Sequence, residues 1–463
     1  MPSRRPSCDR RAAAVPAAVA LAAVPLLWVL LVAAHPAAGA TKVLGDLPRR
    51  GWLGVQFAPG TDGHPKVAAV VPGGSGAKAG LATDDVLLAI DGTDTATPGT
   101  ISATLGRKRT GDTALLHLRR GGKEMDQRVK LAAMPFEKSD DFDILYDVVD
   151  TGKAKLRSVT LSPKGAKGKQ PAILFVQGLQ CAPVDEPVTP PSTVLQLLQA
   201  LTRAGYVVMR CEKPGAGDAT GEPCSEIGFD EEVGGFRAAL AKLRGYDFVD
   251  TSRVFLFGHS MGGIEAPILA TETRVRGVIV YGTGVLPWAE YLVDNERRQT
   301  RLESEVDFAA LETKTRRLAD FLHEVFRNGR PIADVVAQRP DLAPIADEYW
   351  PDRLHSFGRH LDFFRQLDGL NSAEVWTKVD APVLIMFGEL DYTVSWEYAQ
   401  YIAQIVNARR PETARAVEIP HTFHAFNIRD SVDQTLVEPW GGPLSEDVVS
   451  VTTNWLAEVE RKT

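Results

Sequence analysis

The chain has 463 residues, of which 44% are hydrophobic and 24% charged, proportions typical of a folded globular protein. This length predicts two or three domains. The formal net charge of −7, from 52 basic and 59 acidic residues, argues against a dedicated nucleic-acid-binding protein, whose domains carry excess positive charge.

The first 40 residues have the composition of an export signal. Four arginines precede an uncharged run at residues 12–34, and Ala38-Gly39-Ala40 supplies small residues at a cleavage site. We therefore expect cleavage after Ala40 and an exported protein, periplasmic or extracellular. The alternative is an uncleaved signal anchor in the membrane, because the run is long enough to span a bilayer.

Residues 41–50 are expected to be a short linker, after which short strand patterns alternate with glycine-rich turns. GWLGV at 51–55 is followed by an apolar strand at 67–71, then by PGGSGAKAGL at 72–81 and DDVLLAIDG at 84–92. These motifs resemble the PDZ domain of the bacterial protease type over residues 51–133.

The PDZ resemblance implies a peptide-binding loop. In that family the loop, here Trp52, Leu53, Gly54 and Val55, points backbone N–H groups at a peptide carboxylate, while the peptide adds as a strand to the sheet edge. The helix expected near 100–105 would form the other wall of the groove. The implied partner is a peptide C-terminus; the alternative is a PDZ fold used only as a structural support.

Strand and helix patterns alternate over residues 141–463, which predicts an α/β domain with a parallel sheet covered on both faces. Strands are expected at 142–149, 154–161, 171–176, 206–210, 254–257, 275–281, 381–387 and 415–419, and helices at 194–203, 229–243, 264–270, 398–406 and 447–461. Residues 286–379 have helical spacing only and are expected to be inserted between two strands as a lid.

The strongest motif is GHSMG at 258–262. It follows the apolar strand and precedes a helix, which is the context of the nucleophile elbow, a sharp turn that exposes a serine. With the strand–helix alternation, this motif resembles the α/β-hydrolase family, in the branch that is similar to prolyl oligopeptidases and dienelactone hydrolases. The resemblance implies Ser260 as nucleophile, followed along the chain by an acid and a histidine.

The acid is expected just past the first strand after the insertion. Asp391, in FGELD, takes this position, with Glu389 as the nearest rival. In the loop after the last strand, His424 resembles the histidine of the family and His421 is the rival base; His259 is not a candidate. An acid–histidine pair lets the histidine accept the serine proton as Ser260 attacks a carbonyl carbon.

The oxyanion requires two backbone donors. The N–H of Met261, directly after the nucleophile, is the first, and the N–H of Leu179 is expected as the second, with Gln180 as the alternative. The family often has His-Gly where this chain has Gln177-Gly178. The loop at 210–218 resembles a family loop that shapes the floor of the site, and Glu212 is interpreted as structural.

Three cysteines follow the export signal, at positions 181, 211 and 224. An oxidising compartment predicts one disulfide and one free thiol. Cys211–Cys224 is the first choice because the two residues flank a loop. Cys181–Cys211 is the alternative because both residues follow predicted core strands.

These features predict a secreted serine hydrolase that cleaves a carboxylic ester, with a PDZ domain that binds a peptide or partner. One alternative is a serine peptidase or amidase of the prolyl oligopeptidase type; the other is a catalytically inactive peptide-binding scaffold. No cofactor or metal is implied, and the sequence does not decide the oligomeric state or the substrate.

Overall fold

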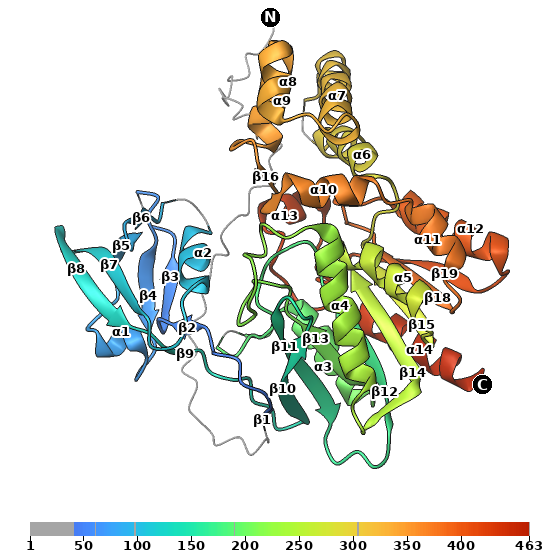
Figure 1. The fold of residues 1–463 in the computed structure, drawn as a ribbon, viewed down its shortest axis with the longest axis horizontal. Coiled ribbons are helices and arrows are strands. Elements are labelled where there is room, and N and C mark those ends of the chain that lie inside the picture. Colours follow the sequence, from blue (N-terminus) through green and yellow to red (C-terminus); the bar gives the residue numbers. More distant parts are fainter. Residues whose placement is uncertain (1–40, 61, 97–98, 189, 303–304, 463) are drawn as a thin grey trace, which may run out of the picture.

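The computed structural model describes residues 41–60, 62–96, 99–188, 190–302 and 305–462 (Figure 1). The predicted export signal at residues 1–40 lies outside the described residues. None of the described helices is both long and apolar enough to cross a bilayer. In Figure 1 a small β-rich unit, in blue, lies beside a larger unit with a long twisted sheet.

The larger unit is built on a nine-stranded sheet with the strand order β1-β10-β11-β13-β12-β14-β15-β18-β19. The strands are β1 Thr41–Val43, β10 Phe142–Asp150, β11 Lys155–Pro163, β12 Gln170–Val176, β13 Val207–Cys211, β14 Val249–His259, β15 Gly277–Tyr281, β18 Val383–Gly388 and β19 Ala414–Ile419. From β13 to β19 all neighbours pair in parallel, whereas β11 is antiparallel to both β10 and β13. The predicted α/β class is confirmed, with a mixed rather than purely parallel sheet.

Helices cover both faces of this sheet. The helices are α3 Thr193–Arg203, α4 Phe229–Arg244, α5 Gly262–Glu272, α12 Trp396–Arg409 and α14 Glu446–Arg461, with the short α13 Val432–Val437 before the last. Successive side chains of a strand point to opposite faces. In β12, Phe175 shares a core with Trp455 of α14, while Leu174 shares the other core with Phe236 of α4. Burial on both faces explains why these strands are continuous apolar runs.

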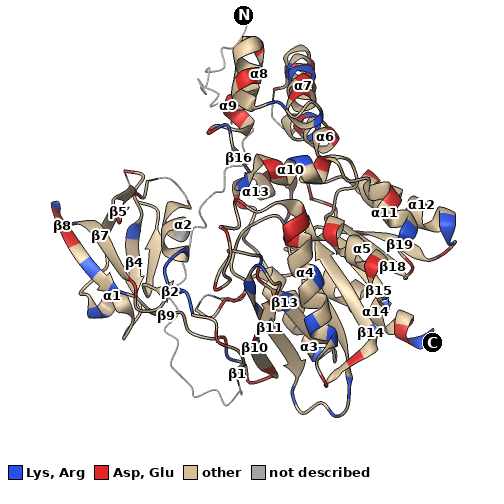
Figure 2. Ribbon diagram, viewed as in Figure 1, with Lys and Arg blue, Asp and Glu red and all other residues tan. Residues whose placement is uncertain are grey.

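A helical insertion separates β15 from β18. It contains α6 Trp288–Thr300, α7 Phe308–Leu322, a π-helical turn His323–Arg327, α8 Ile332–Gln338, a 3-10 turn Pro340–Leu342, α9 Ala343–Tyr349, the paired short strands β16 His355–Ser356 and β17 Arg359–His360, α10 Leu361–Asp368 and α11 Ser372–Lys378. The strand pair was not expected from the sequence. Phe321, Trp350 and Trp376 are buried in the same core as one face of the sheet, so the insertion is packed onto the sheet rather than loosely tethered. Acidic and basic residues are mixed along α7 (Figure 2).

The small unit has a core of its own. Its elements are β2 Gly51–Trp52, β3 Val55–Ala58, β4 Lys66–Val70, α1 Ser75–Lys78, β5 Val86–Ile90, β6 Thr93–Asp94, α2 Thr100–Gly106, β7 Thr113–Arg120, β8 Lys123–Lys130 and β9 Ala132–Ala133. Leu53, Leu87 and Leu116 are buried together in this core. The sheet order β3-β4-β5-β7-β8 leaves β3 as an edge strand, where an added strand has unpaired backbone groups to bond.

The segment expected to be a linker at residues 41–50 is part of the large unit. β1 pairs in parallel with β10, with Thr41 opposite Ile144, so the chain enters the large sheet, leaves it to form the small unit and returns at β10. The exit and return paths pair with each other, since Gly51 in β2 lies opposite Ala133 in β9. The small unit is therefore inserted between two strands of the large sheet.

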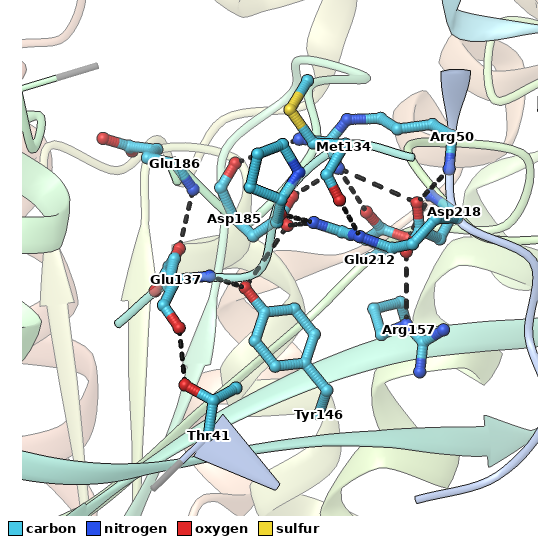
Figure 3. A network of polar contacts seen from close by, with 12 residues as sticks. Thr41, Arg50, Met134, Glu137, Tyr146, Arg157, Asp185, Glu186, Glu212 and Asp218 are labelled. Atoms are coloured by element: carbon cyan, nitrogen blue, oxygen red, sulfur yellow. Dashed lines mark hydrogen bonds and ion pairs between the residues drawn. The ribbon is translucent and has the colours of Figure 1, made fainter. Parts of the chain in front are cut away.

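A buried polar network fixes this junction (Figure 3). Arg49 forms ion pairs of 2.5 Å with Asp185 and 2.7 Å with Asp218, and all three side chains are buried. Arg50 pairs with Asp185, and its backbone N–H donates to Asp218 Oδ1 at 2.8 Å. Arg157 Nε donates to Asp218 Oδ2 at 3.3 Å. Because several bonds with directional geometry converge here, the small unit has a fixed attachment.

The disulfide joins Cys181 to Cys224, and Cys211 is a buried free thiol. Both expected pairings, Cys211–Cys224 and Cys181–Cys211, are therefore wrong. Cys211 is the last residue of β13 and its side chain points into the core between strand and helices. Cys181 and Cys224 lie in two loops, where their Cα atoms come within 5.7 Å, a separation typical of disulfides.

Candidate active site

Ser260 lies on the sharp turn between β14 and α5. Its φ is 55°, in the left-handed region that residues with a side chain rarely adopt. The flanking glycines are required, since a Cβ at Gly258 would lie 2.2 Å from the Gly262 oxygen and a Cβ at Gly262 would lie 2.0 Å from the Val176 oxygen. The Ser260 N–H donates to the Tyr281 oxygen at 2.9 Å. This strained strand–turn–helix geometry is that of a nucleophile elbow.

Asp391 and His424 form a hydrogen-bonded pair at the same end of the sheet. Asp391 follows β18, His424 follows β19, and His424 Nδ1 lies 2.7 Å from Asp391 Oδ2. Both residues are buried, and Asp391 Oδ1 accepts from the Thr393 N–H at 2.8 Å. With its Nδ1 proton directed to the carboxylate, the imidazole presents Nε2 as a proton acceptor.

The rival residues lie outside this pair. Glu389 Oε2 accepts a hydrogen bond of 2.8 Å from the backbone N–H of His421. His421 is exposed and its φ is 51°, so it shapes the loop that carries His424. The structure thus brings Asp391 together with His424 and not with His421.

Three neighbours hold His424 in place. The Tyr281 hydroxyl donates to the Phe423 oxygen at 2.8 Å, and His259 Nε2 donates to the His424 oxygen at 2.9 Å. Burial, with a smaller effect of the nearby His424, lowers the pKa of His259 to about 3, so its ring is neutral at neutral pH. At Gly282, with a φ of 59°, a Cβ would lie 2.9 Å from His424 Nδ1.

Tyr281 and Gly282 lie in no sequence motif that marks them as site residues. Their only signal is position: Tyr281 ends β15 and Gly282 follows it directly, and β15 lies between β14, which precedes Ser260, and β18, which precedes Asp391. The carboxyl ends of neighbouring parallel strands meet at one edge, so residues that end β15 necessarily lie near both.

The loop of residues 177–180, here called the oxyanion loop, follows β12 and lies against Ser260. A Cβ at Gly178 would come 3.2 Å from Ser260 Cβ and 3.7 Å from its Oγ. Met261 is the N-cap residue of α5, and the first N–H groups of a helix have no carbonyl partner within it. The roles of the Met261 and Leu179 N–H groups as oxyanion donors stay predictions.

The loop after β13 has the buried, internally bonded character expected of a structural element. Glu212 Oε2 accepts from the N–H groups of Asp218 at 2.8 Å and Ala219 at 2.9 Å. Burial and the nearby Asp218 and Asp185 carboxylates raise the pKa of Glu212 well above its usual range. At Gly217, with a φ of 56°, a Cβ would lie 1.7 Å from Glu212 Oε1, so this turn requires glycine.

In the small unit, the predicted peptide-binding loop is held through its carbonyl groups. The Leu53 oxygen accepts from the Gly76 N–H at 2.6 Å, and the Gly54 oxygen accepts from the Val71 N–H at 2.9 Å. Gly54 has a φ of 72°, which suits glycine. Trp52 lies in β2 and Val55 begins the edge strand β3.

Comparisons with known proteins match both units. Residues 189–434 match the family model described as the alpha/beta hydrolase family, and residues 51–131 match the model of the PDZ domain. The PDZ resemblance of the N-terminal unit is thereby confirmed.

A curated relative, Esterase EstD of Thermotoga maritima, is 23% identical over 280 residues, which cover 58% of this chain. The chain spans about 60% of the length of that relative. Two solved structures resemble the chain more loosely. Est1E from Butyrivibrio proteoclasticus, with ferulic acid bound, has a TM-score of 0.45 and 16% identity, covering 68% of this chain and 99% of its own. Proline iminopeptidase from Mycobacterium smegmatis has a TM-score of 0.41 and 18% identity, covering 68% and 99%.

Proposed function

Because the chain belongs to the alpha/beta hydrolase family, we propose that it is a serine hydrolase that cleaves a carboxylic ester. One observation carries this proposal: an Asp391–His424 hydrogen bond of 2.7 Å at the same end of the sheet as a serine held at a positive φ on a strand–helix turn. The esterase named among the relatives favours an ester over an amide as the substrate.

In the proposed reaction, Ser260 Oγ attacks the ester carbonyl carbon while His424 Nε2 accepts the hydroxyl proton. Asp391 holds the imidazole in the required tautomer and stabilises the imidazolium. The N–H groups of Met261 and Leu179 bind the oxyanion, a type of contact worth roughly 3 kcal/mol each. His424 then gives its proton to the leaving alcohol, and water, activated by the same histidine, releases the acid from the acyl-enzyme.

Labelling with a fluorophosphonate probe tests the nucleophile. The purified full chain should be labelled on Ser260, as located by peptide mass spectrometry, and Ser260→Ala should remove both the label and the ester hydrolysis. A folded wild-type protein that takes no label at Ser260 would be the inactive scaffold instead. A panel of acyl esters and aminoacyl amides then separates an esterase from a peptidase, since a peptidase would cleave the amides at comparable rates.

We further propose that the protein is exported and that the helical insertion restricts access to the site as a lid. The disulfide supports export, because disulfides persist in oxidising compartments. N-terminal sequencing of the protein expressed with its first 40 residues should give Thr41 as the first residue; an intact N-terminus in the membrane fraction would indicate the signal anchor.

The PDZ domain is proposed to bind a peptide C-terminus along β3. The edge position of β3 and Gly54 directly before the strand support this proposal, because an added strand needs unpaired backbone groups and close approach. Binding of fluorescent peptides with free C-termini, but not of the same peptides with amidated ends, is the expected result in a polarisation assay. Equal binding of both forms would contradict recognition of the carboxylate.

A further inference from the structure

A buried cluster of ionisable side chains lies beneath the oxyanion loop and has no part in the proton transfers described above. Its members come from four separate elements: Lys213 after β13, Glu232 in α4, Glu265 in α5 and Arg359 in β17. None of the four is more than 1% exposed. Taking a charge out of water costs several kcal/mol, so a cluster of this kind requires an explanation.

The two cations donate to consecutive carbonyl groups of the oxyanion loop. Lys213 Nζ donates to the Gly178 oxygen at 2.5 Å, and Arg359 Nη1 donates to the Leu179 oxygen at 3.1 Å. In a trans peptide the C=O of one residue and the N–H of the next lie in one plane and point in opposite directions. Fixing the Gly178 oxygen therefore fixes the Leu179 N–H, and fixing the Leu179 oxygen fixes the Gln180 N–H.

These two amides are the predicted oxyanion donor and its alternative. The loop also lies close to Ser260, since a Cβ added at Gly178 would be 3.7 Å from Ser260 Oγ. A loop with a glycine has many accessible conformations, and a backbone donor contributes to catalysis only when its N–H is aimed at the oxyanion in advance. The cations supply that constraint from the side of the loop opposite the proposed donors.

One carboxylate holds both cations. Glu232 Oε1 lies 2.6 Å from Lys213 Nζ, and Glu232 Oε2 lies 2.5 Å from Arg359 Nη2. The Arg359 guanidinium also lies 4.0 Å from the centre of the Phe363 ring, a cation–π contact. Burial, and then the neighbouring Glu232, raises the pKa of Glu265 well above its usual range. Burial lowers the pKa of Lys213, and the contact of its ammonium with Glu232 opposes this effect.

We propose that Lys213 and Arg359, bridged by Glu232, are positioning residues that hold the oxyanion loop in its catalytic conformation. This inference rests on the proposed serine hydrolase function. Since Arg359 belongs to the helical insertion, the insertion supplies part of the support of the oxyanion hole and is more than a cover over the site. The expected effect is on transition-state stabilisation, that is on kcat, with little effect on KM.

The test compares Lys213→Met with a matched control, Arg210→Met. Arg210 lies in β13, three residues before Lys213, and forms a buried ion pair with Glu137 rather than with the oxyanion loop. Both variants break a buried ion pair, so both should lower the denaturation midpoint. Lys213→Met should lower kcat for an activated ester about 10- to 100-fold with KM nearly unchanged. It should also weaken binding of a boronic acid, which mimics the tetrahedral state. Arg210→Met should keep kcat within about threefold of wild type.

Arg359→Lys gives an independent check. A lysine keeps the positive charge but lacks the planar guanidinium group, whose two terminal nitrogens bond Glu232 and the Leu179 oxygen at the same time. We expect an intermediate loss of kcat in this variant and a larger loss in Arg359→Leu. Unchanged kcat in Lys213→Met and Arg359→Leu, or equal losses in Arg210→Met, would overturn the positioning role.

Hydrogen exchange separates this inference from the proposed function. Amide exchange of residues 178–181 should be faster in Lys213→Met or Arg359→Lys than in wild type, and unchanged in Arg210→Met. This readout needs no activity. If Ser260 in wild type takes no fluorophosphonate, the hydrolase proposal fails and the catalytic part of the inference fails with it. If Ser260 is labelled but exchange in the loop does not change, the positioning role alone is wrong.

Discussion

At the scale of single residues, the geometry of Asp391 is notable because both of its oxygens are engaged. Oδ2 bonds the His424 ring at 2.7 Å, while Oδ1 accepts from the Thr393 N–H at 2.8 Å. The carboxylate is therefore held by the backbone and cannot rotate to follow the imidazole. A fixed carboxylate fixes the ring, which is what proton transfer from a nearby serine requires.

Asp391→Asn should lower kcat by about 10⁴-fold, because an amide can stabilise the wrong tautomer of His424. The measurement is steady-state hydrolysis of an activated ester, with the fluorophosphonate rate at Ser260 as a second readout. Glu389→Gln is the control, since its Oε1 can still accept from the His421 N–H, and its kcat should stay near wild type. A loss in Glu389→Gln as large as in Asp391→Asn would identify the wrong acid.

Gly282 offers a second test at this scale. An alanine there would place its Cβ 2.9 Å from His424 Nδ1 and 3.1 Å from Asp391 Oδ2. It would also adopt a positive φ, which costs about 1–2 kcal/mol. Gly282→Ala should therefore lower both the free energy of unfolding and kcat. Gly284→Ala is the matched control, since its Cβ would meet nothing closer than Ile264 Cδ1 at 4.0 Å. Equal effects of the two substitutions in urea unfolding and ester hydrolysis would show that contact with the pair is irrelevant.

Site residues differ in how far the sequence can predict them. Ser260 has a local signature, because the elbow needs glycines at fixed offsets between a strand and a helix. Asp391 and His424 have weaker signatures and are placed by chain order. Lys213 and Arg359 have no sequence signature. Arg359 and the Leu179 oxygen that it bonds are 180 positions apart, and the sequence does not distinguish a buried lysine or arginine from one on the surface.

At the scale of elements, the Cys181–Cys224 disulfide ties the oxyanion loop to the loop after β13. Cys181 directly follows Gln180, and the bond closes a loop with a sequence separation of 43 residues. Its location could not be predicted from spacing alone, because the pairing depends on which loops meet in space. The spacing favours Cys211 as a partner, but Cys211 ends the central strand β13 with its side chain in the packed core and is a free thiol.

Replacing both Cys181 and Cys224 with alanine should lower the free energy of unfolding by about 4 kcal/mol. This is the loss of loop-closure constraint expected for a loop of this length. Cys211→Ala removes a buried thiol but no covalent link, so it should cost about 1 kcal/mol. Chemical denaturation measures both. Thiol titration of the wild-type protein should find no reactive thiol within residues 41–462 until the protein unfolds, because Cys211 is buried.

At the scale of the whole molecule, the two units are joined by more than a tether. The strand β1 pairs with β10 of the large sheet before the chain enters the PDZ domain. The buried Arg49 forms ion pairs with Asp185 and Asp218 of the large unit, and the buried Arg50 forms one with Asp185. Residues 41–50 lack any strand pattern long enough to predict β1, which has three residues. Deleting residues 41–133 would remove β1, Arg49 and Arg50 together with the PDZ domain, so the effect of such a deletion would not report on the PDZ domain alone.

Arg49→Met should destabilise the protein by about 3–5 kcal/mol, because it leaves buried carboxylates with fewer cations. Arg203→Met is the control: Arg203 and Asp141 form an exposed ion pair of 2.9 Å, whose loss should cost less than about 1 kcal/mol. Guanidinium unfolding of the full chain measures both. Equal, small losses would mean that the junction is held by packing rather than by the ion pairs.

A cleaner test of coupling between the two units follows from the β2–β9 pairing. Trp52 lies opposite Ala132, so residues 53–131 can be replaced by Asn-Gly, a two-residue turn that joins antiparallel strands. This variant keeps β1, Arg49 and Arg50. If the PDZ domain only recruits a peptide-bearing partner or substrate, kcat for a small activated ester should stay within about threefold of wild type, while peptide binding is lost. Circular dichroism and the protection of the β1 amides from hydrogen exchange show whether the variant is folded. If it is folded but its kcat for the small ester falls strongly, the PDZ domain instead supports the active site itself.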